Sequence, residues 1–362
     1  MSGPEASSAL AGALIVAGFE GPRLDRDTTS ALAEGRRAGL ILFRRNIESV
    51  EQVRALTTEI VRAAGSALSP FVCVDQEGGR VARLAAPVVE LPPMRVLGDI
   101  GDPALTRRAG EIVGRELAAL GFNVDFAPVL DVDSNPQNPV IGDRSFGRDA
   151  ERVTSLAIPF GEGLESSGVL ACGKHFPGHG DTDKDSHFDL PIVHQPASRL
   201  RAVELPPFAA AASRLGSFMT AHVVYEALDP DVPATLSRAI VTDLLRGELG
   251  FSGVLFSDDL EMRALADRYD VEDSAVEAVR AGCDVVLVCQ HYDLAERAHA
   301  ALVEEIERDA AFRRRAVEAR ARTEAARRRF PARPATSTAE LLRVLAESGA
   351  RELVEEIARR RS

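Results

Sequence analysis

Two patterns of apolar and polar positions alternate along most of the chain. Eight short runs are continuously apolar, and mixed, helix-like stretches such as residues 50–65 and 275–282 separate them. The runs occupy residues 14–19, 38–43, 71–76, 123–132, 170–176, 217–224, 253–260 and 283–290. Continuous apolar character is typical of strands that are buried on both faces. Eight strand–helix repeats predict an α/β fold of the (β/α)8 TIM barrel type.

A long charged region follows the eighth run. We expect it to form two or three helices, interrupted at residues 330–338, with a last helix from Ala339 to Arg361. That last helix carries apolar residues at helical spacing, which favours packing on the barrel exterior or on a partner subunit. The sequence therefore predicts a single domain, a catalytic barrel over residues 1–293, with a C-terminal helical region over residues 294–362.

Composition narrows the class of protein. The formal net charge of -12 offers no basic field for phosphates, so we expect no nucleic-acid partner and no anionic membrane partner. No apolar run is long enough to span a bilayer. Residues 9–17 are apolar, but no Lys or Arg precedes them, and we interpret them as a first strand rather than a signal peptide.

Cysteine usage indicates the compartment. The chain has four cysteines, and they form no CxxC pair. Three of them, Cys73, Cys172 and Cys289, lie inside apolar runs, where cysteine behaves as a small buried apolar residue. A reducing, cytoplasmic location is the expectation.

Polar residues gather where the predicted strands end. Asp75 to Glu77, Asp131 with Asp133, Lys174 with His175, His222, and Asp258 with Asp259 all occupy such positions. In a (β/α)8 barrel the carboxyl ends of the strands form the catalytic face. Their convergence on one rim predicts an active site there.

Residues 173–191, GKHFPGHGDTDKDSHFDLP, form the segment richest in chemistry. A calcium loop starting at Asp181 is unfavourable, because Ser186 stands where glycine is expected and Ile192 where an acidic ligand is expected. A zinc site from the histidines stays open on spacing. The alternative is proton transfer, in which Asp185 orients the nearby imidazole of His187 and favours its protonated form.

The second reactive segment is FSDDLEM, residues 256–262, which follows an apolar strand. An aspartate in this position can cap a helix, and we assign that role to Asp259. Asp258 would then project into the barrel mouth as a nucleophile.

These motifs together resemble the bacterial β-N-acetylglucosaminidase branch of glycoside hydrolase family 3. KHFPGHG, DSH and SDDLEM occur in that order, and VDQEGGRVARL, FAPVLDVD, IGDRSFG and MTAHVVY also look like that branch. The resemblance extends from about residue 14 to residue 289.

The resemblance implies a role for each matching residue. Asp258 would attack the anomeric carbon, and His187 assisted by Asp185 would be the acid/base. Further residues would hydrogen-bond the sugar hydroxyls: Asp75, Arg80, Arg144, Lys174 and His175. Most glycosidases use two carboxylates, so a histidine paired with an aspartate is a departure from the general pattern.

The function expected from the resemblance is a retaining exo-β-N-acetylglucosaminidase that needs no cofactor and no metal. Its partner would be a small carbohydrate, a GlcNAc-terminated cell-wall muropeptide or a chitooligosaccharide, and the chain would be a monomer or a homodimer. Three alternatives remain. They are a phosphorylase that uses phosphate in place of water, a metal-dependent hydrolase, and a non-catalytic sugar-binding protein.

Overall fold

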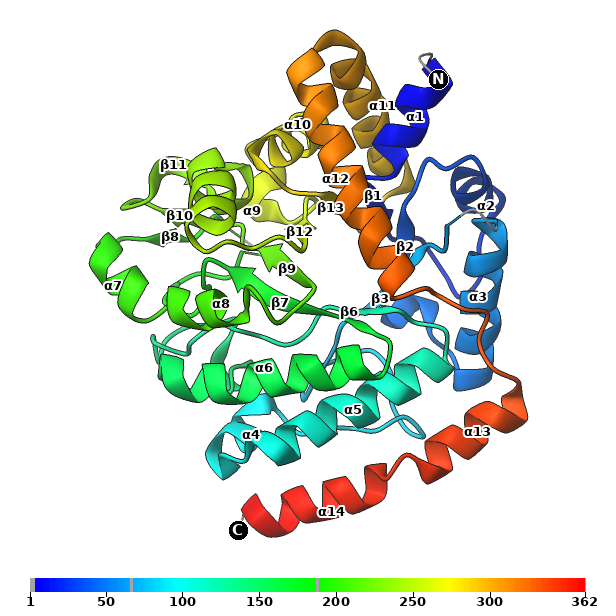
Figure 1. Cartoon of the computed structure of the whole chain (residues 1–362), viewed down its shortest axis with the longest axis vertical. Coiled ribbons are helices and arrows are strands. Elements are labelled where there is room, and N and C mark those ends of the chain that lie inside the picture. Colours follow the sequence, from blue (N-terminus) through cyan, green and yellow to red (C-terminus); the bar gives the residue numbers. More distant parts are fainter. Residues whose placement is uncertain (1–3, 66–67, 187–188, 362) are drawn as a thin grey trace.

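The computed structural model describes residues 4–65, 68–186 and 189–361. Within them, eight parallel strands close into a barrel in the order β1-β13-β12-β9-β7-β6-β3-β2 (Figure 1). The barrel strands are β1 (Ile15–Ala17), β2 (Gly39–Leu42), β3 (Phe71–Val74), β6 (Val124–Asp125), β7 (Leu170–Phe176), β9 (Ser217–Thr220), β12 (Val254–Asp259) and β13 (Val285–Val288). Each lies within one of the eight apolar runs, so the predicted TIM barrel is confirmed.

Helices surround this barrel. They are α1 (Pro4–Gly12), α2 (Arg26–Ala33), α3 (Val50–Ala63), α4 (Met94–Ile100), α5 (Pro103–Ala119), α6 (Ala150–Ser166), α7 (Ala197–Ala202), α8 (Leu205–Ala211), α9 (Arg263–Ala266), α10 (Val271–Ala281), α11 (Tyr292–Arg308), α12 (Ala310–Arg329), α13 (Thr338–Glu347) and α14 (Ala350–Arg361). A π-helical segment, Ala239–Glu248, lies between β9 and β12. Helix α3 shows the local logic: Ser49 caps its first turn, and Val53, Leu56 and Ile60 bury one face.

Two small sheets add to the strand ends. Strands β4 (Gln76–Gly78) and β5 (Val81–Ala82) pair as a hairpin directly after β3. Strands β8 (Ile192–Val193), β10 (Val224–Tyr225) and β11 (Asp229–Pro233) form a second sheet. Both sheets belong to the loops that follow barrel strands, the segments that carry function in this fold.

Aromatic side chains fill the barrel interior. The rings of Phe71 and Phe126 meet the ring of Phe256 edge-on, at centroid distances of 5.6 and 5.3 Å. Because strand side chains alternate between the two faces, the residues two or four positions further along the same inward face point into the barrel mouth. In β7 and β12 these positions hold Lys174 and Asp258.

Helix α12 covers the amino ends of the strands, and Figure 1 shows it crossing in front of the barrel. Phe330, which follows α12, packs within the interior cluster, and its carbonyl accepts a hydrogen bond from Asn123 Nδ2 at 2.8 Å. The guanidinium of Arg327 lies 5.7 Å from the centre of the Phe71 ring. The amino end of the barrel is thus closed by side chains.

The C-terminal segment differs from the expected single helix over residues 339–361. It forms α13 and α14, which are separated at Ser348 and Gly349, where Gly349 adopts a positive φ of 81°. That conformation ends helices at little cost only for glycine. Helix α13 packs on α5 and α14 packs on α4, on the outside of the barrel (Figure 1). The domain boundary at residue 293 stays a prediction.

The N-terminal prediction was wrong in part. Residues 9–12 belong to helix α1, and β1 begins at Ile15. A short apolar run can belong to a buried helix or a buried strand, and here it contains both. In the described ranges no helix combines the length and the apolar character needed to cross a membrane.

Candidate active site

A cavity of about 520 Å³ opens at the carboxyl ends of the barrel strands. Five of the residues predicted for the site line it: Asp75, Arg144, Lys174, His175 and Asp258. They come from distant parts of the sequence, and the closed barrel brings the strand ends together. A volume of this size is in the range of small-ligand sites.

Two acidic and two basic side chains form the floor on one side of the cavity. Lys174 Nζ, at the end of β7, lies 2.8 Å from Asp75 Oδ1 and 2.6 Å from Glu77 Oε1. Arg144 binds Glu77 in a bidentate manner, with Nε and Nη2 each 2.8 Å from a carboxylate oxygen. We call Asp75, Glu77, Arg144 and Lys174 the charged cluster. Each charge has a partner, which burial of charged groups requires.

The charged cluster is ionised at neutral pH. Burial alone would raise the pKa of Glu77, but the charges of Arg144 and Lys174 prevail and lower that pKa to about 2. Burial would also raise the pKa of Asp75, but the charges of Lys174 and Arg83 hold that pKa well below its usual range. Burial would lower the pKa of Lys174, but Asp75 and Glu77 hold it above its usual range. Fixed donors and acceptors of this kind suit a ligand with several hydroxyl groups.

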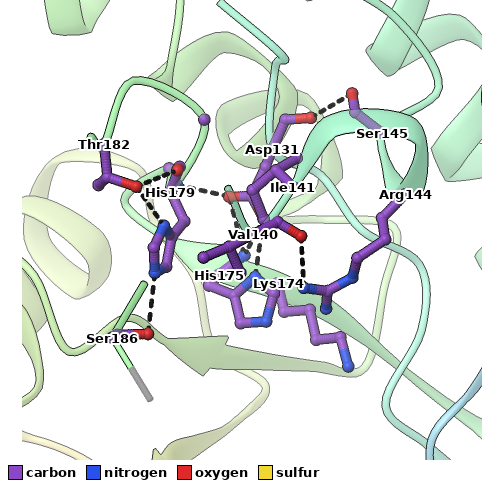
Figure 2. A network of polar contacts seen from close by, with 12 residues as sticks. Asp131, Val140, Ile141, Arg144, Ser145, Lys174, His175, His179, Thr182 and Ser186 are labelled. Carbon is purple, nitrogen blue, oxygen red and sulfur yellow. Dashed lines mark hydrogen bonds and ion pairs between the residues drawn. The ribbon is translucent and has the colours of Figure 1, made fainter. Parts of the chain in front are cut away.

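A second network is organised by the carboxylate of Asp131, which is fully buried. Figure 2 shows the His175 ring directed toward it, while the His179 ring lies between Thr182 and Ser186. His175 Nδ1 lies 2.7 Å from Asp131 Oδ2, and the backbone N–H of His179 donates to Asp131 Oδ1 at 2.6 Å. Burial would raise the pKa of Asp131, but the charge of His175 lowers it below its usual value. Asp131 therefore orients the imidazole of His175, which lines the cavity.

The loop after β7 is tied to this network through His179 (Figure 2). His179 Nδ1 lies 2.8 Å from Thr182 Oγ1, and its Nε2 lies 3.0 Å from Ser186 Oγ. Burial, followed by the charge of His175, lowers the pKa of His179 to about 4, so its ring is neutral at pH 7. Ser186 lines the cavity and follows Asp185, which is partly exposed and is not among the lining residues described. His187, the expected proton donor, lies outside the described residues.

The other predicted reactive residue, Asp258, lies in β12 and lines the cavity. The pairing of β12 with β13 shifts register between Phe256 and Asp259, so Asp258 stands at an irregularity of the strand. Such bulges next to active sites redirect a side chain. The Asp258 carboxylate accepts the backbone N–H of Asp259 at 2.8 Å.

Asp259 does not cap a helix, contrary to the sequence-based expectation. Helix α9 begins at Arg263, and the carboxylate of Asp259 instead accepts the backbone N–H groups of Glu261 and Cys289, each at 3.1 Å. Burial, followed by the nearby charge of Glu261, raises the pKa of Asp259 to about 7. The Asp259 carboxylate therefore links the ends of β12 and β13 by hydrogen bonds.

Of two arginines near the hairpin after β3, Arg80 was expected to bind the substrate, and Arg83 was given no role. Arg80 is half-exposed and donates to the carbonyls of Val140 and Ile141, and it is not among the described residues that line the cavity. Arg83 lines the cavity instead and lies 3.1 Å from Asp75 Oδ2. The direction of each side chain is set by the β4–β5 turn, which the sequence motif alone does not reveal.

Among the residues of this site that received no role from the sequence are Glu77, Arg83 and Asp131. Glu77 and Asp131 stand at strand ends, so their positions carried a signal. Their partners in the fold, Arg144 and His175, are 67 and 44 residues away. The part of the chain that the structure describes contains no group of three or more His, Cys, Asp or Glu arranged to hold a metal ion.

Comparison with known proteins identifies the class as a glycoside hydrolase on a TIM barrel. Residues 10–322 match the family described as the glycosyl hydrolase family 3 N terminal domain. The chain belongs to glycosyl hydrolase family 3.

Relatives with assigned names share most of this chain. A protein from Alkalilimnicola ehrlichii named beta-hexosaminidase is 43% identical over 284 residues, covering 76% of this chain and 80% of its own. The solved family 3 beta-N-acetylglucosaminidase of Paenibacillus sp. str. FPU-7 superposes with a TM-score of 0.91 at 39% identity, covering 98% of this chain and 68% of that one. Native NagZ of Neisseria gonorrhoeae superposes with a TM-score of 0.72 at 33% identity, covering 85% of this chain and 97% of that one.

Proposed function

We propose that this chain is a retaining exo-β-N-acetylglucosaminidase with Asp258 as nucleophile. The observation that carries the proposal is the position of Asp258 in the same cavity as the charged cluster. The relatives named beta-hexosaminidase and beta-N-acetylglucosaminidase supply the identity of the sugar. The substrate is a small carbohydrate with a terminal β-linked N-acetylglucosamine.

The charged cluster binds the non-reducing sugar. A hydroxyl group donates one hydrogen bond and accepts others, so neighbouring hydroxyls fit between a carboxylate and an ammonium or guanidinium group. Asp75, Lys174 and His175 keep the assigned binding role, and Arg144 acts with Glu77. Arg83 takes the binding role that the sequence assigned to Arg80, because Arg83 lines the cavity.

The reaction proceeds in two displacements. The Asp258 carboxylate attacks the anomeric carbon while the bond to the leaving oxygen breaks, and His187, oriented by Asp185, gives that oxygen a proton. In the second step His187 takes a proton from water, which attacks the anomeric carbon and releases Asp258. Two inversions retain the configuration.

The finer identity of the substrate follows from the same proposal. A muropeptide that carries GlcNAc on anhydro-N-acetylmuramic acid, or a chitooligosaccharide, would extend from the cavity toward solvent. A cytoplasmic role in peptidoglycan recycling fits this substrate.

The test is turnover of 4-nitrophenyl N-acetyl-β-glucosaminide by the purified chain after EDTA treatment, with and without phosphate, and the product anomer read by NMR. We expect metal-independent release of β-N-acetylglucosamine. Asp258→Ala should lower kcat by about 10⁴-fold or more, as loss of a nucleophile does, while Asp243→Ala, at an exposed ion pair, should leave it unchanged. A sugar 1-phosphate product would indicate a phosphorylase. Loss of turnover after EDTA treatment would indicate a metal-dependent enzyme. Sugar binding without turnover would indicate a sugar-binding protein.

His187→Ala tests the proton donor. Substrates with poor leaving groups need protonation, so they should slow by about 100-fold or more, and activated aryl glycosides should slow much less. Equal losses on both substrates would contradict the assignment of His187.

A further inference from the structure

Side-chain hydrogen bonds hold the peptide that follows Asp258. Where β12 departs from its pairing with β13, Ser257 Oγ accepts the backbone N–H of Leu287 at 3.0 Å and donates to the carbonyl of Asp258 at 2.7 Å. The Asp259 carboxylate binds the N–H of Cys289 at 3.1 Å. On the β13 side of the bulge, these side chains supplement the backbone hydrogen bond from the Leu260 N–H to the Leu287 carbonyl at 2.9 Å.

His222 provides the corresponding contact on the other side. It follows β9, the barrel neighbour of β12, and its side chain is fully buried. His222 Nε2 lies 2.9 Å from the carbonyl oxygen of Asp259, and Nδ1 lies 2.7 Å from Thr235 Oγ1. The imidazole therefore spans from the segment after β11 to the residue next to Asp258.

These contacts define the tautomer of His222. A carbonyl oxygen only accepts, so Nε2 must carry the proton that it donates to Asp259. Nδ1 of His222, at 2.7 Å, and the Ala221 carbonyl, at 3.1 Å, both lie within hydrogen-bond distance of Thr235 Oγ1, so this hydroxyl anchors the Nδ1 side of the ring. Thr220 Oγ1 lies 2.8 Å from Thr235 Oγ1 and extends the network. Hydrogen bonds in such a network reinforce one another.

We propose that His222 is a positioning residue that fixes Asp258 for attack, by holding the Asp259 carbonyl with Nε2–H. The inference rests on the proposed role of Asp258 as nucleophile. The strand irregularity next to Asp258 disrupts the regular ladder of hydrogen bonds that keeps a strand rigid. The contact from His222 adds a restraint one residue away from the reacting carboxylate.

A role in folding alone and a role in positioning predict different measurements. If His222 only stabilises the barrel, its loss lowers thermal stability and leaves the chemistry of the folded enzyme unchanged. If it positions Asp258, the rate of covalent bond formation falls while sugar binding by the charged cluster stays the same. A displacement of about 1 Å in a reacting group can cost about 100-fold in rate.

The experiment follows formation of the glycosyl ester with 2-acetamido-2-deoxy-5-fluoro-β-glucosyl fluoride as the probe. The Asp258 carboxylate forms the bond to the anomeric carbon, the carbon–fluorine bond breaks, and fluoride leaves without a proton from His187. Intact-mass measurements give the rate constant and the concentration dependence, and peptide mapping identifies the labelled residue.

Two variants of His222 form a matched pair. The amide of His222→Gln can reach the position of Nε2 and donate to the Asp259 carbonyl, whereas the shorter His222→Asn mimics only the Nδ1 side. We expect the labelling rate constant to fall about 100-fold in His222→Asn and less than about 10-fold in His222→Gln, with the half-saturating concentration within about twofold of wild type. Equal losses in both variants, or a wild-type rate in His222→Asn, would overturn the proposal.

Thr235 provides a second pair if His222→Asn does not fold. Thr235→Val removes the hydroxyl that anchors the Nδ1 side of the ring and should slow labelling about 10-fold, while Thr235→Ser keeps the hydroxyl and should restore most of the rate. Equal rates in these two variants would also overturn the proposal. Failure to label Asp258 in the wild-type protein overturns the nucleophile assignment as well, whereas normal labelling in every variant removes only the role of His222.

Discussion

The two ends of the barrel contain buried ion pairs of similar chemistry in opposite settings. At the carboxyl end, Lys174 lies between Asp75 and Glu77 beside an open cavity. At the amino end, the fully buried Asp284 binds Arg246 at 2.6 Å and Arg322 at 3.1 Å, and it also pairs with Arg315. Helix α12 supplies two of these arginines and covers that end.

The difference between the two ends teaches what an ion pair is used for. Around Asp284 the charged groups pair with one another beneath helix α12, and of these four residues only Arg322 lines the cavity found at this end. In the charged cluster the groups neutralise one another but border a cavity of about 520 Å³. The first arrangement holds elements together, and the second keeps donors and acceptors in place for a ligand.

Among the changes that test this comparison, Lys174→Met is expected to have the largest effect on activity. Removal of the ammonium leaves Asp75 and Glu77 without a shared partner and disrupts the sugar-binding floor. We expect kcat/KM to fall about 1000-fold, which corresponds to about 4 kcal/mol. The unfolding free energy should fall by less than about 2 kcal/mol, because Arg83 still pairs with Asp75 and Arg144 with Glu77. Kinetics and urea unfolding measure both quantities.

Arg238→Met, at an exposed ion pair, is the matched control and should change neither quantity measurably. A Lys174→Met protein with wild-type kcat/KM would contradict the assignment of the charged cluster to substrate binding.

Asp284→Ala should show the reverse behaviour. It leaves the three arginines without their common acceptor in a closed environment, so we expect the unfolding free energy to fall by about 3 kcal/mol or more. The kcat/KM of the folded enzyme at 25 °C should stay within about twofold of wild type, because the catalytic face is untouched. Urea unfolding is the measurement, with exposed Asp243→Ala expected within about 0.5 kcal/mol of wild type. A large loss of kcat/KM in folded Asp284→Ala would show that the two ends are coupled.

The smallest effect, counted per pH unit, is expected for Asp125, a buried carboxyl without a cationic partner of the kind that Asp284 has. Its Oδ1 accepts the N–H of Gln76 at 2.9 Å, and its Oδ2 has no hydrogen-bond partner among the described residues. Burial raises the pKa of Asp125 to about 8 from an ordinary value of 3.8. The folded chain therefore holds a proton that the unfolded chain releases, and stability is lost as the pH rises through this window.

Asp125→Asn removes this titration. Between pH 4 and pH 8 the unfolding free energy of the variant, relative to wild type, should rise by up to about 1.4 kcal/mol per pH unit. Urea unfolding at pH 5, 6, 7 and 8 measures the slope. Parallel curves for the two proteins would mean that Asp125 is ionised in the fold and that an unassigned group neutralises it.

The sequence predicted the barrel better than it predicted the direction of side chains. Strands buried on both faces must be apolar throughout, so each of the eight runs located a strand. Arg80 and Arg83 lie three residues apart in one motif, and the hairpin turn between β4 and β5 decided which of them reaches Asp75. Pairings such as Arg144 with Glu77 depend on loops from different strands and leave no local signal.

The chain by itself determined the eight strands, the acidic character, and the types of residue at the strand ends, because these follow from local periodicity and composition. Only the tertiary structure decided that Arg83 enters the cavity, that Asp131 orients His175, and that the Asp259 carbonyl meets His222. It also decided that α13 and α14 separate at Gly349. The physical reason is that closing a barrel sets distances between residues far apart in sequence, and those distances determine which charges and hydrogen-bonding groups become partners.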